Sequence, residues 1–584
     1  MPNLPVDVVA DLAYVLARAE RSGTISGDDA TTADRLLESL RGDWRDLEGE
    51  ARQSLGRIAA PLRARRDGMD GRMPPRDGGD PRPLRDILDI LGVPSLRPGQ
   101  DRPILAAMAG ADSLVVMPTG SGKSLCFQAP AFCGGGLTVV VSPLIALISD
   151  QHSRLAAAGL PVAMVTSTQS PAETRAAIDM IRRREARLVL CAPERFVHEA
   201  FTQALQANPI DVLAIDEAHC VSEWGHDFRP DYLRLAELRQ VLNPRCVMAL
   251  TATATPEVSA EITSRLGLRD PVTVRTGFDR TNLSLDVIPL EGKGAVARKW
   301  AVLMAGLEVQ GGTPAIVYCG TRKATDEVAE GLRARGLNAV GYHAGMAGPA
   351  RQEAQDAFMS GRADVIAATN AFGMGIDRSD VRGVWHWSIP TSLEGYYQEA
   401  GRAGRDGLPG RAVLLAMRAD LGRLIRFAQQ DRGPGDSRIA RDRAWTAYRA
   451  INGYIESPTC RRRVILDHFG DTAAGAAEGR CCDVCDPLPA DAIPTSVPSI
   501  RKAPSVDEPD MDADDSAMFE QLRAWRRDRA EGKPAYTVCT DAALRSIAVR
   551  RPRNEDQLLE VKGVGPAFVE RHAESLFDVL MDAA

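Results

Sequence analysis

The chain has 584 residues, of which 44% are hydrophobic and 26% charged, a composition typical of a soluble globular protein. It excludes collagen-like, wholly disordered and disulfide-scaffold proteins, and at about 150 residues per domain the length predicts about four domains. The net charge of −7 argues at first against a nucleic-acid partner, because proteins that bind nucleic acids usually carry a basic surface.

The N-terminal region is predicted to be a helical extension followed by a linker. Residues 1–65 space their apolar side chains as a helix does, whereas residues 66–83 are rich in Gly, Pro and charge. A partner-docking module and an inert extension fit residues 1–65 equally well. Asp7 and Asp11 stand where a signal peptide would carry basic residues, so no signal peptide is expected.

Residues 84–415 alternate short Val, Ile and Leu runs with helical stretches, which predicts parallel α/β units. One stretch, 124–149, carries no charge and is long enough to cross a bilayer. Pro130, Pro143 and the three glycines at 134–136 would interrupt a single helix there. The stretch therefore predicts a helix, a glycine turn and a buried strand at 137–141, and we expect no membrane partner.

The apolar run 113–117 leads into Pro-Thr-Gly-Ser-Gly-Lys-Ser at 118–124, the pattern of a phosphate-binding loop between a strand and a helix. Gly120 and Gly122 allow backbone N–H groups to surround phosphates. Lys123 is predicted to reach the terminal phosphates of ATP, and Ser124 to bind Mg²⁺. The predicted nucleotide-binding residues of this loop are Thr119, Gly120, Ser121, Gly122, Lys123 and Ser124.

A second apolar run, 212–215, ends at Asp216 and Glu217, and His219 follows. The run predicts a buried strand that delivers Asp216 to the magnesium ion and Glu217 to the water that attacks the γ-phosphate. Two acids after a strand often only cap a helix. Their pairing with the phosphate-binding loop is what indicates nucleotide hydrolysis.

The order of these motifs resembles that of superfamily 2 helicases, and specifically the RecQ DNA helicases. The segments that carry the resemblance are Leu96–Gln100, Met117–Ser124, Val141–Leu147, Asp216–His219, Ser222–Tyr232, Ala249–Thr255, Tyr318–Arg322, Ala368–Asp377 and Tyr397–Asp406. The resemblance implies an α/β fold of two tandem RecA-like domains, at 84–279 and 280–415, of which the first binds ATP. A helical zinc-binding subdomain at 416–485 and a small all-α HRDC-like bundle at 516–584 would follow.

The resemblance also implies nucleotide contacts outside the phosphate-binding loop. Arg97 and Gln100 would bind the adenine base, and Asp377 would contact the nucleotide from the second domain. Relatives usually offer an aromatic residue four positions before Arg97, where this chain has Val93. That difference bears on how strictly the site prefers ATP.

Two arginines are implied to complete the catalytic site from the second domain. Arg402 and Arg405 lie three residues apart, so that the start of a helix would aim both across the domain cleft. Arg405 would be the arginine finger and Arg402 would contact phosphate. A solvated basic helix face is the alternative. In the first domain, His219 would relay the presence of DNA to Glu217.

The DNA contacts implied by the resemblance centre on an aromatic-rich loop. Trp224 and Phe228 would stack on single-stranded bases, each stack contributing about 1–3 kcal/mol, and Arg229 would bind the backbone. Burial of Trp224 in the core is the alternative. The further implied DNA-binding residues are Ser142, Pro143, Arg322, Thr369 and Asn370, and Thr251 and Thr253 resemble the motif that links the ATP and strand sites.

Four of the 11 cysteines lie close together in sequence, at Cys460, Cys481, Cys482 and Cys485. Four thiolates suit tetrahedral Zn²⁺, and Cys482 and Cys485 have the spacing of a chelating pair. The other seven are scattered singly among apolar residues, as expected of reduced, buried thiols in a cytosolic protein. Disulfides are the disfavoured alternative.

Residues 486–515 contain six Pro and eight acidic residues against two basic ones, which predicts a disordered linker of net charge −6. Most of the excess negative charge therefore lies outside the predicted binding surfaces, and it does not exclude DNA. Many RecQ proteins carry a winged-helix domain at this point, for which the segment is too short. In the C-terminal bundle, Gly563 and Gly565 permit a tight turn whose backbone N–H groups could bind a DNA phosphate. A protein-docking or autoregulatory role of the bundle is the alternative.

These features and the resemblance together predict a bacterial DNA helicase that uses ATP, Mg²⁺ and Zn²⁺. The resemblance implies that it moves 3′ to 5′ on single-stranded DNA and unwinds duplex or branched DNA in repair or recombination. We expect a cytoplasmic, nucleoid-associated monomer, with single-strand-binding or repair proteins as candidate partners. An RNA helicase, a DNA translocase with weak strand separation and a non-catalytic annealing protein are the alternatives.

Overall fold

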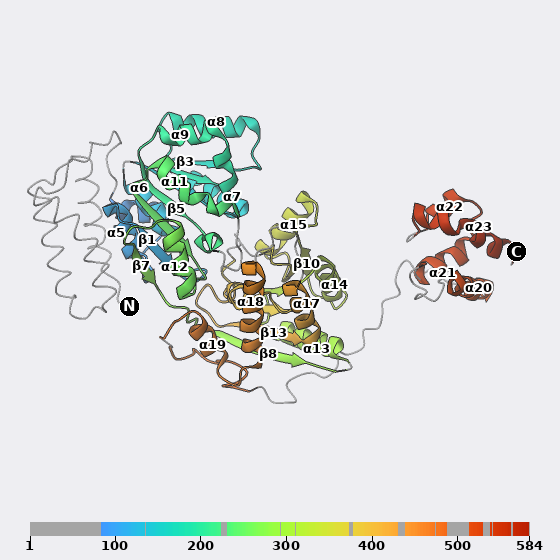
Figure 1. Ribbon diagram of the computed structural model, residues 1–584. Coiled ribbons are helices and arrows are strands. Elements are labelled where there is room, and N and C mark those ends of the chain that lie inside the picture. Colours follow the sequence, from blue (N-terminus) through green and yellow to red (C-terminus); the bar gives the residue numbers. More distant parts are fainter. Residues whose placement is uncertain are drawn as a thin grey trace, which may run out of the picture. The chain divides into compact units, whose positions relative to one another are not determined.

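The computed structural model describes residues 83–134, 136–222, 230–292, 294–309, 311–372, 378–429, 438–472, 475–487, 513–529, 538–539, 541–561 and 564–582. The chain divides into two compact units, Met1–Val497 and Pro498–Ala584, and each is described by itself (Figure 1). The predicted extension at 1–65, nearly all of the linker at 66–83 and most of the linker at 486–515 lie outside the described residues.

The first unit contains two parallel sheets, the first with seven strands in the order β3-β4-β2-β5-β6-β1-β7. Its strands are β1 (Ser113–Val116), β2 (Leu137–Val141), β3 (Val162–Val165), β4 (Leu188–Cys191), β5 (Ile210–Ile215), β6 (Cys246–Thr251) and β7 (Val272–Arg275). Its helices are α4 (Leu84–Ile90), α5 (Asp101–Ala109), α6 (Leu125–Cys133), α7 (Ile145–Ala157), α8 (Pro171–Arg182), α9 (Glu199–Gln206), α10 (Pro230–Leu233), α11 (Leu235–Leu242) and α12 (Pro256–Arg265), with the 3₁₀ helices η1 (Pro193–Val197) and η2 (Ala218–Val221).

The strands of this sheet are buried on both faces, because their residues alternate between two apolar clusters. Val115 of β1 packs in one cluster with Val140 of β2, whereas Val116 packs in the other with Val139 and Val141. Apolar side chains of the helices complete both clusters, as is usual for a parallel sheet. All strands end at the same edge of the sheet, so the loops after β1, β2, β5 and β6 meet there.

The uncharged stretch 124–149 folds within this sheet, which confirms the prediction. It forms α6, β2 and the start of α7, and β2 occupies Leu137–Val141. Helix α6 accommodates Pro130 and ends at Cys133, before the glycines. Among the described residues, no helix is long and apolar enough to cross a membrane.

The second sheet has six parallel strands in the order β10-β11-β9-β12-β13-β8. Its strands are β8 (Leu283–Leu290), β9 (Ala315–Tyr318), β10 (Ala339–Tyr342), β11 (Val365–Ala368), β12 (Gly383–His386) and β13 (Gly410–Met417). Its helices are α13 (Ala295–Glu308), α14 (Arg322–Arg333), α15 (Gly348–Met359) and α16 (Leu393–Ala400). Strand β13 runs slightly past the domain boundary predicted at 415.

Three helices and a cysteine-bearing segment follow the second sheet and pack against it (Figure 1). They are α17 (Arg418–Gln429), α18 (Arg438–Glu456) and α19 (Arg461–His468), with the segment 475–487. The backbone N–H of Leu285, in β8, donates to the Cys481 carbonyl at 3.0 Å, and that of Val287 donates to Asp483 Oδ1 at 3.2 Å. The cysteine-bearing segment therefore satisfies backbone groups at the free edge of β8.

The second unit is a small helical bundle, the fold that the resemblance implies. Its helices are α20 (Ala513–Arg529), α21 (Asp541–Arg550), α22 (Glu555–Leu559) and α23 (Pro566–Asp582). Leu522, Leu544, Ile547 and Leu576 are fully buried in its core. Helix α20 begins inside the linker predicted at 486–515, because Met518 and Phe519 belong to this core and the preceding turn continues their helix.

Candidate active site and zinc cluster

The phosphate-binding loop lies between β1 and α6, as the sequence predicts. Gly120 and Gly122 both have a φ of 82°, in the left-handed region that glycine adopts without strain. A Cβ atom at Gly122 would also lie 2.5 Å from the Nε2 of Gln100. The ammonium of Lys123 is folded back over the loop, where it donates to the carbonyls of Met117 at 3.0 Å and Pro118 at 3.4 Å.

The acidic residues stand at the end of β5, beside the loop. The backbone N–H of Asp216 donates to the Val141 carbonyl at 2.9 Å, which aligns the ends of β5 and β2. Burial and then the Glu217 carboxylate raise the pKa of Asp216 to about 6, although Lys123 opposes the shift. Burial lowers the pKa of Lys123 despite the two acids. Two buried carboxylates therefore lie side by side at the end of β5, with the Lys123 ammonium near them.

Glu217 has a backbone conformation that is rare for its residue type. Its φ is 48°, in the left-handed region, where side chains with a Cβ are strained. Strain of this kind persists where the surrounding structure enforces it, often at functional sites. Here the strained residue is the one predicted to handle the attacking water.

Ser142 lies against Asp216 in this structure, and its predicted role in binding DNA stays a prediction. Its hydroxyl donates to Asp216 Oδ2 at 3.1 Å, and its side chain is buried. Because β2 and β5 are adjacent, the residue after β2 faces the acid after β5 and not the solvent. Pro143 follows at the start of the turn into α7.

His219 joins the acids to β6. Its Nδ1 lies 3.3 Å from Glu217 Oε2 and 2.9 Å from Thr251 Oγ1, and the backbone N–H of Thr253 donates to the same Thr251 oxygen at 3.2 Å. Burial opposes protonation of His219, but Cys220 and Glu217 outweigh it and raise the pKa to about 10. The imidazole is thus placed to transmit a movement of the Thr251 segment to Glu217.

Arg97 and Gln100 contact the phosphate-binding loop in this structure. The side chain of Gln100 donates to the carbonyls of Gly122 at 2.8 Å and Ser121 at 3.2 Å, and the Arg97 guanidinium donates to the Gly120 carbonyl. Their predicted contact with adenine stays a prediction. Val93 packs partly buried against the apolar core.

Arg402 and Arg405 lie opposite the phosphate-binding loop, on a segment that we name the arginine loop (residues 401–405). The hydroxyl of Thr119 lies 3.5 Å from the Gly401 carbonyl, and a Cβ atom at Gly120 would lie 3.2 Å from Arg405 Cγ. Arg402 is buried. The sequence predicts that the two arginines lie at the start of a helix, and this is wrong. They follow the end of α16, because the chain turns at Gly401 and Gly404 has a φ of 59°.

The remaining predicted residues are spread over the second sheet and the undescribed segments. Arg322 begins α14 after β9, and Thr369 and Asn370 follow β11, the neighbouring strand. Arg322 and Asn370 are exposed, and the three residues share the edge at which parallel strands end. The other predicted residues, Trp224, Phe228, Arg229, Asp377 and Gly563, lie outside the described residues.

The four clustered cysteines come together in space. All their Sγ atoms lie within 4.8 Å of one another, with Cys460 Sγ 3.6 Å from that of Cys481 and 3.9 Å from that of Cys482. A tetrahedral zinc site with Zn–S bonds of about 2.3 Å places its sulfurs about 3.8 Å apart. A disulfide needs about 2.05 Å, and all 11 cysteines are free thiols, so the cluster fits zinc and not disulfides.

The seven scattered cysteines are buried, as the sequence predicts. They are Cys126, Cys133, Cys191, Cys220, Cys246, Cys319 and Cys539. Burial raises the pKa of Cys126 and of Cys319 to about 12, so these thiols are neutral and unreactive at physiological pH.

Several residues of these sites had no separate signal in the sequence. Gln151, in α7, donates to Ser124 Oγ at 3.3 Å. Arg461 directly follows Cys460 and donates to Asp483, between the other cysteines, with Nη2 at 2.8 Å. Arg280 contacts the arginine loop from the segment between the sheets. Each contact joins elements that are far apart in sequence, which local patterns do not reveal.

Comparison with known families finds four matches in chain order. Residues 97–262 match the DEAD/DEAH box helicase family, and residues 298–407 match the helicase conserved C-terminal domain. Residues 418–486 match the RecQ zinc-binding family, and residues 515–580 match the HRDC domain.

Three curated relatives, each named ATP-dependent DNA helicase RecQ, are 38% identical to this chain. The Haemophilus influenzae protein matches over 69% of this chain and 64% of its own length. The Pasteurella multocida protein matches over 68% and 61%, and the Bacillus subtilis protein over 68% and 66%. The chain therefore spans somewhat less than two thirds of each relative. Its four family matches, in this order, and its identity to these relatives show that the chain belongs to the RecQ family of helicases.

Proposed function

We propose that this chain is an ATP- and Mg²⁺-dependent DNA helicase that moves 3′ to 5′ along single-stranded DNA and opens duplex or branched DNA. The observation that carries the proposal is the approach of Arg405, from the second sheet's domain, to Gly120 and Lys123 of the first. A γ-phosphate held there would be bound by cations of both domains. Hydrolysis of ATP and release of the phosphate would weaken the contact between the two domains and move the bound DNA strand.

The residues of the cleft have chemically distinct roles in this proposal. Lys123 would leave its two carbonyl partners and bind phosphate, while Glu217 would orient the attacking water and accept its proton. Arg405 would neutralise charge on the transferring phosphoryl group, with Arg402 on a neighbouring phosphate oxygen. His219 would couple Glu217 to Thr251 and so to the strand site.

Mg²⁺ fits the donor set beside the phosphate-binding loop. Ser124 and Asp216 supply hydroxyl and carboxylate oxygens, the ligands that Mg²⁺ prefers. Burial and then the Glu217 carboxylate raise the pKa of Asp216 to about 6, and a divalent cation bound there would stabilise the ionised carboxylate. Held by these two residues, Mg²⁺ would supply positive charge to the phosphate oxygens.

The DNA partner is supported by family membership and by the edge of the second sheet. Arg322, Thr369 and Asn370 lie at that edge, where they would contact the DNA strand together with the aromatic-rich loop.

We further propose a monomeric, cytoplasmic protein associated with the nucleoid, with single-strand-binding or repair proteins as partners.

Glu217→Gln is the sharpest test of the proposed hydrolysis. The amide cannot accept a proton, so we expect ATP turnover to fall by about 10²-fold or more while ATP is still bound. Forked duplexes with either a 3′ or a 5′ single-stranded tail, labelled for strand separation, would report unwinding. We expect the unaltered chain to open the 3′-tailed substrate with ATP and Mg²⁺, and Glu217→Gln to open neither.

The same assay distinguishes the alternatives. ATP turnover stimulated by RNA but not by DNA oligonucleotides would indicate an RNA helicase. Turnover with DNA but no strand separation would indicate a translocase, and no turnover with any nucleic acid would leave only a binding or annealing protein. Unwinding of the 5′-tailed substrate alone would refute the proposed direction.

Val93→Tyr tests whether the adenine pocket lacks an aromatic wall. A ring stacked on the base contributes about 1 kcal/mol, so we expect the KM for ATP to fall about fivefold with kcat unchanged. The measurement is steady-state ATP hydrolysis at saturating single-stranded DNA, with Val93→Leu as a control that adds size without a ring. An equal fall of KM in both variants would mean that added apolar contact, not stacking, is responsible.

A further inference from the structure

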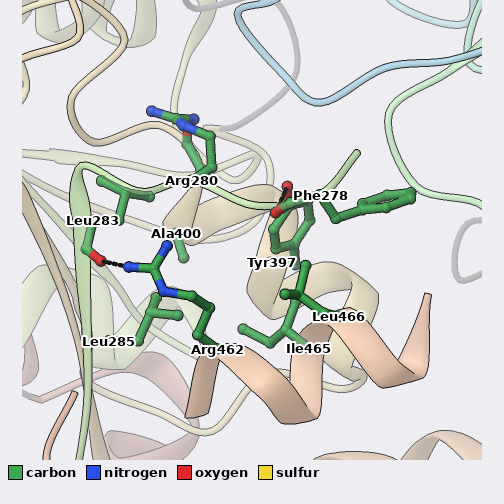
Figure 2. Close-up of a pocket in the computed structure, with 10 residues that line it drawn as sticks. Phe278, Arg280, Leu283, Leu285, Tyr397, Ala400, Arg462, Ile465 and Leu466 are labelled. Atoms are coloured by element: carbon green, nitrogen blue, oxygen red, sulfur yellow. Dashed lines mark hydrogen bonds between the residues drawn. The ribbon is translucent and has the colours of Figure 1, made fainter. Parts of the chain in front are cut away.

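The segment between the two sheets, residues 276–282, is held from several sides and is here named the interdomain segment. The Phe278 ring stacks on Phe469, with centroids 4.2 Å apart, and the backbone N–H of Phe278 donates to Asp471 Oδ2 at 2.6 Å. The Tyr397 hydroxyl, from α16, donates to the Phe278 carbonyl at 2.8 Å (Figure 2). The segment is therefore a packed element with fixed partners.

Helix α19 contributes to the same junction. Arg462 forms an ion pair with Asp279. It also donates to the Leu283 carbonyl at 2.9 Å (Figure 2). Ile465 and Leu466 of α19 line a cavity of about 20 Å³ together with residues of the interdomain segment and of α16. The interdomain segment thus lies between α19 and the arginine loop.

Arg280 connects this segment to the arginine loop. Its Nη1 donates to the Gly401 carbonyl at 3.0 Å, and its Nη2 donates to the carbonyls of Ala403 at 2.9 Å and Gly404 at 3.0 Å. A guanidinium presents its donors in a rigid planar fork, so three carbonyls bound by one side chain fix the path of the loop between them. Asn282 adds bonds of 2.8 Å to the carbonyls of Gly404 and Leu408.

The Gly401 carbonyl is shared between the two domains. It accepts from Arg280 and also lies 3.5 Å from the Thr119 hydroxyl of the phosphate-binding loop. Arg405 follows four residues later and borders Gly120. The position of the arginine side chains opposite the phosphates therefore depends on where Arg280 holds this backbone.

We propose that Arg280 is a positioning residue for ATP hydrolysis, which holds the arginine loop so that Arg402 and Arg405 face the phosphate-binding loop. The proposal rests on the proposed function, since it requires that the chain hydrolyses ATP. Arg280 touches no phosphate in this scheme and acts through Arg405. A mispositioning of about 1 Å at a catalytic group costs about 10²-fold in rate, which sets the size of the expected effect.

The test uses the full-length, zinc-loaded chain and the variants Arg280→Met, Arg280→Lys, Arg405→Ala and the double variant Arg280→Met with Arg405→Ala. Steady-state ATP hydrolysis with saturating single-stranded DNA gives kcat and KM. The affinity for a fluorescent ADP analogue, the zinc content and the melting temperature are measured alongside. Arg275→Met is the matched control, because Arg275, the last residue of β7, also donates to backbone carbonyls, those of Thr255 and Phe469.

We expect Arg280→Met to lower kcat by about 10²-fold, with ADP affinity within about twofold, full zinc content and a melting temperature within about 4 °C. Arg280→Lys, which keeps donors near the carbonyls, should recover part of kcat. The kcat of the double variant should lie within about threefold of that of Arg405→Ala alone, because the two changes remove the same function and their effects should not multiply.

Three results would overturn the proposal. One is an Arg280→Met variant with unchanged kcat, and another is a double variant whose losses multiply. The third is a loss of kcat in Arg280→Met that Arg275→Met shows equally, together with lowered stability or zinc content, since that indicates a structural role. An unaltered chain without DNA-stimulated hydrolysis would instead refute the proposed function, so the two failures are distinguishable.

Discussion

Lys123→Ala is expected to lower DNA-stimulated ATP turnover by at least about 10³-fold, because the variant loses the cation predicted to bind the terminal phosphates. The Lys123 ammonium donates to the carbonyls of Met117 and Pro118. It lies near the Asp216 carboxyl, whose pKa is raised by burial. Loss of the ammonium also removes a cation that stabilises the buried Asp216 carboxylate. Phosphate release in saturating ATP and single-stranded DNA measures the effect.

An exposed lysine provides the control for this variant. Lys323, on α14, has a side chain 86% exposed and pairs only loosely with Glu327 at 3.6 Å. Lys323→Ala removes the same charge from the chain and should leave turnover unchanged. Retention of more than about a tenth of the activity by Lys123→Ala would contradict the assigned nucleotide site, given that loss of one preorganised donor already costs about 10²-fold.

Cys482→Ser is expected to abolish zinc binding and to lower the melting temperature of the first unit by about 10 °C or more. Loss of a structural metal is among the largest single-residue effects, above about 4 kcal/mol, and each kcal/mol lowers the midpoint by about 2–4 °C in a domain of this size. Cys482 is fully buried, between Cys481 and Asp483, which bond to β8. Its loss should release the segment that covers this strand.

Zinc content, from a chromogenic chelator titration, and calorimetry would measure the outcome. Cys133→Ser changes a buried thiol of α6 outside the cluster and should keep a full equivalent of zinc. Prolonged exposure of the unaltered chain to a strong chelator should reproduce the loss of stability seen in Cys482→Ser. A Cys482→Ser protein with full zinc and an unchanged midpoint would exclude Cys482 as a ligand.

Local features of the sequence were enough to predict the elements that carry the site. The buried strand Leu137–Val141 appears where the apolar run predicts it, and the phosphate-binding loop lies between a strand and a helix. The zinc cluster was also predicted from the sequence, by the chelate spacing of Cys482 and Cys485. Cys460 lies further away along the chain and was included because it is also a cysteine. These predictions succeed because hydrophobic runs, glycine conformations and chelate spacings act over a few residues.

The tertiary structure alone decided which residues meet. It placed Ser142 on Asp216 and set Arg402 and Arg405 after a helix, not at its start. It also joined Arg280 to Gly401, 121 residues further along the chain. Such contacts depend on strand order and on the packing of whole elements, whose free energy is summed over the fold. The sequence therefore determined the chemistry that this protein carries, and long-range packing determined how that chemistry is held in place.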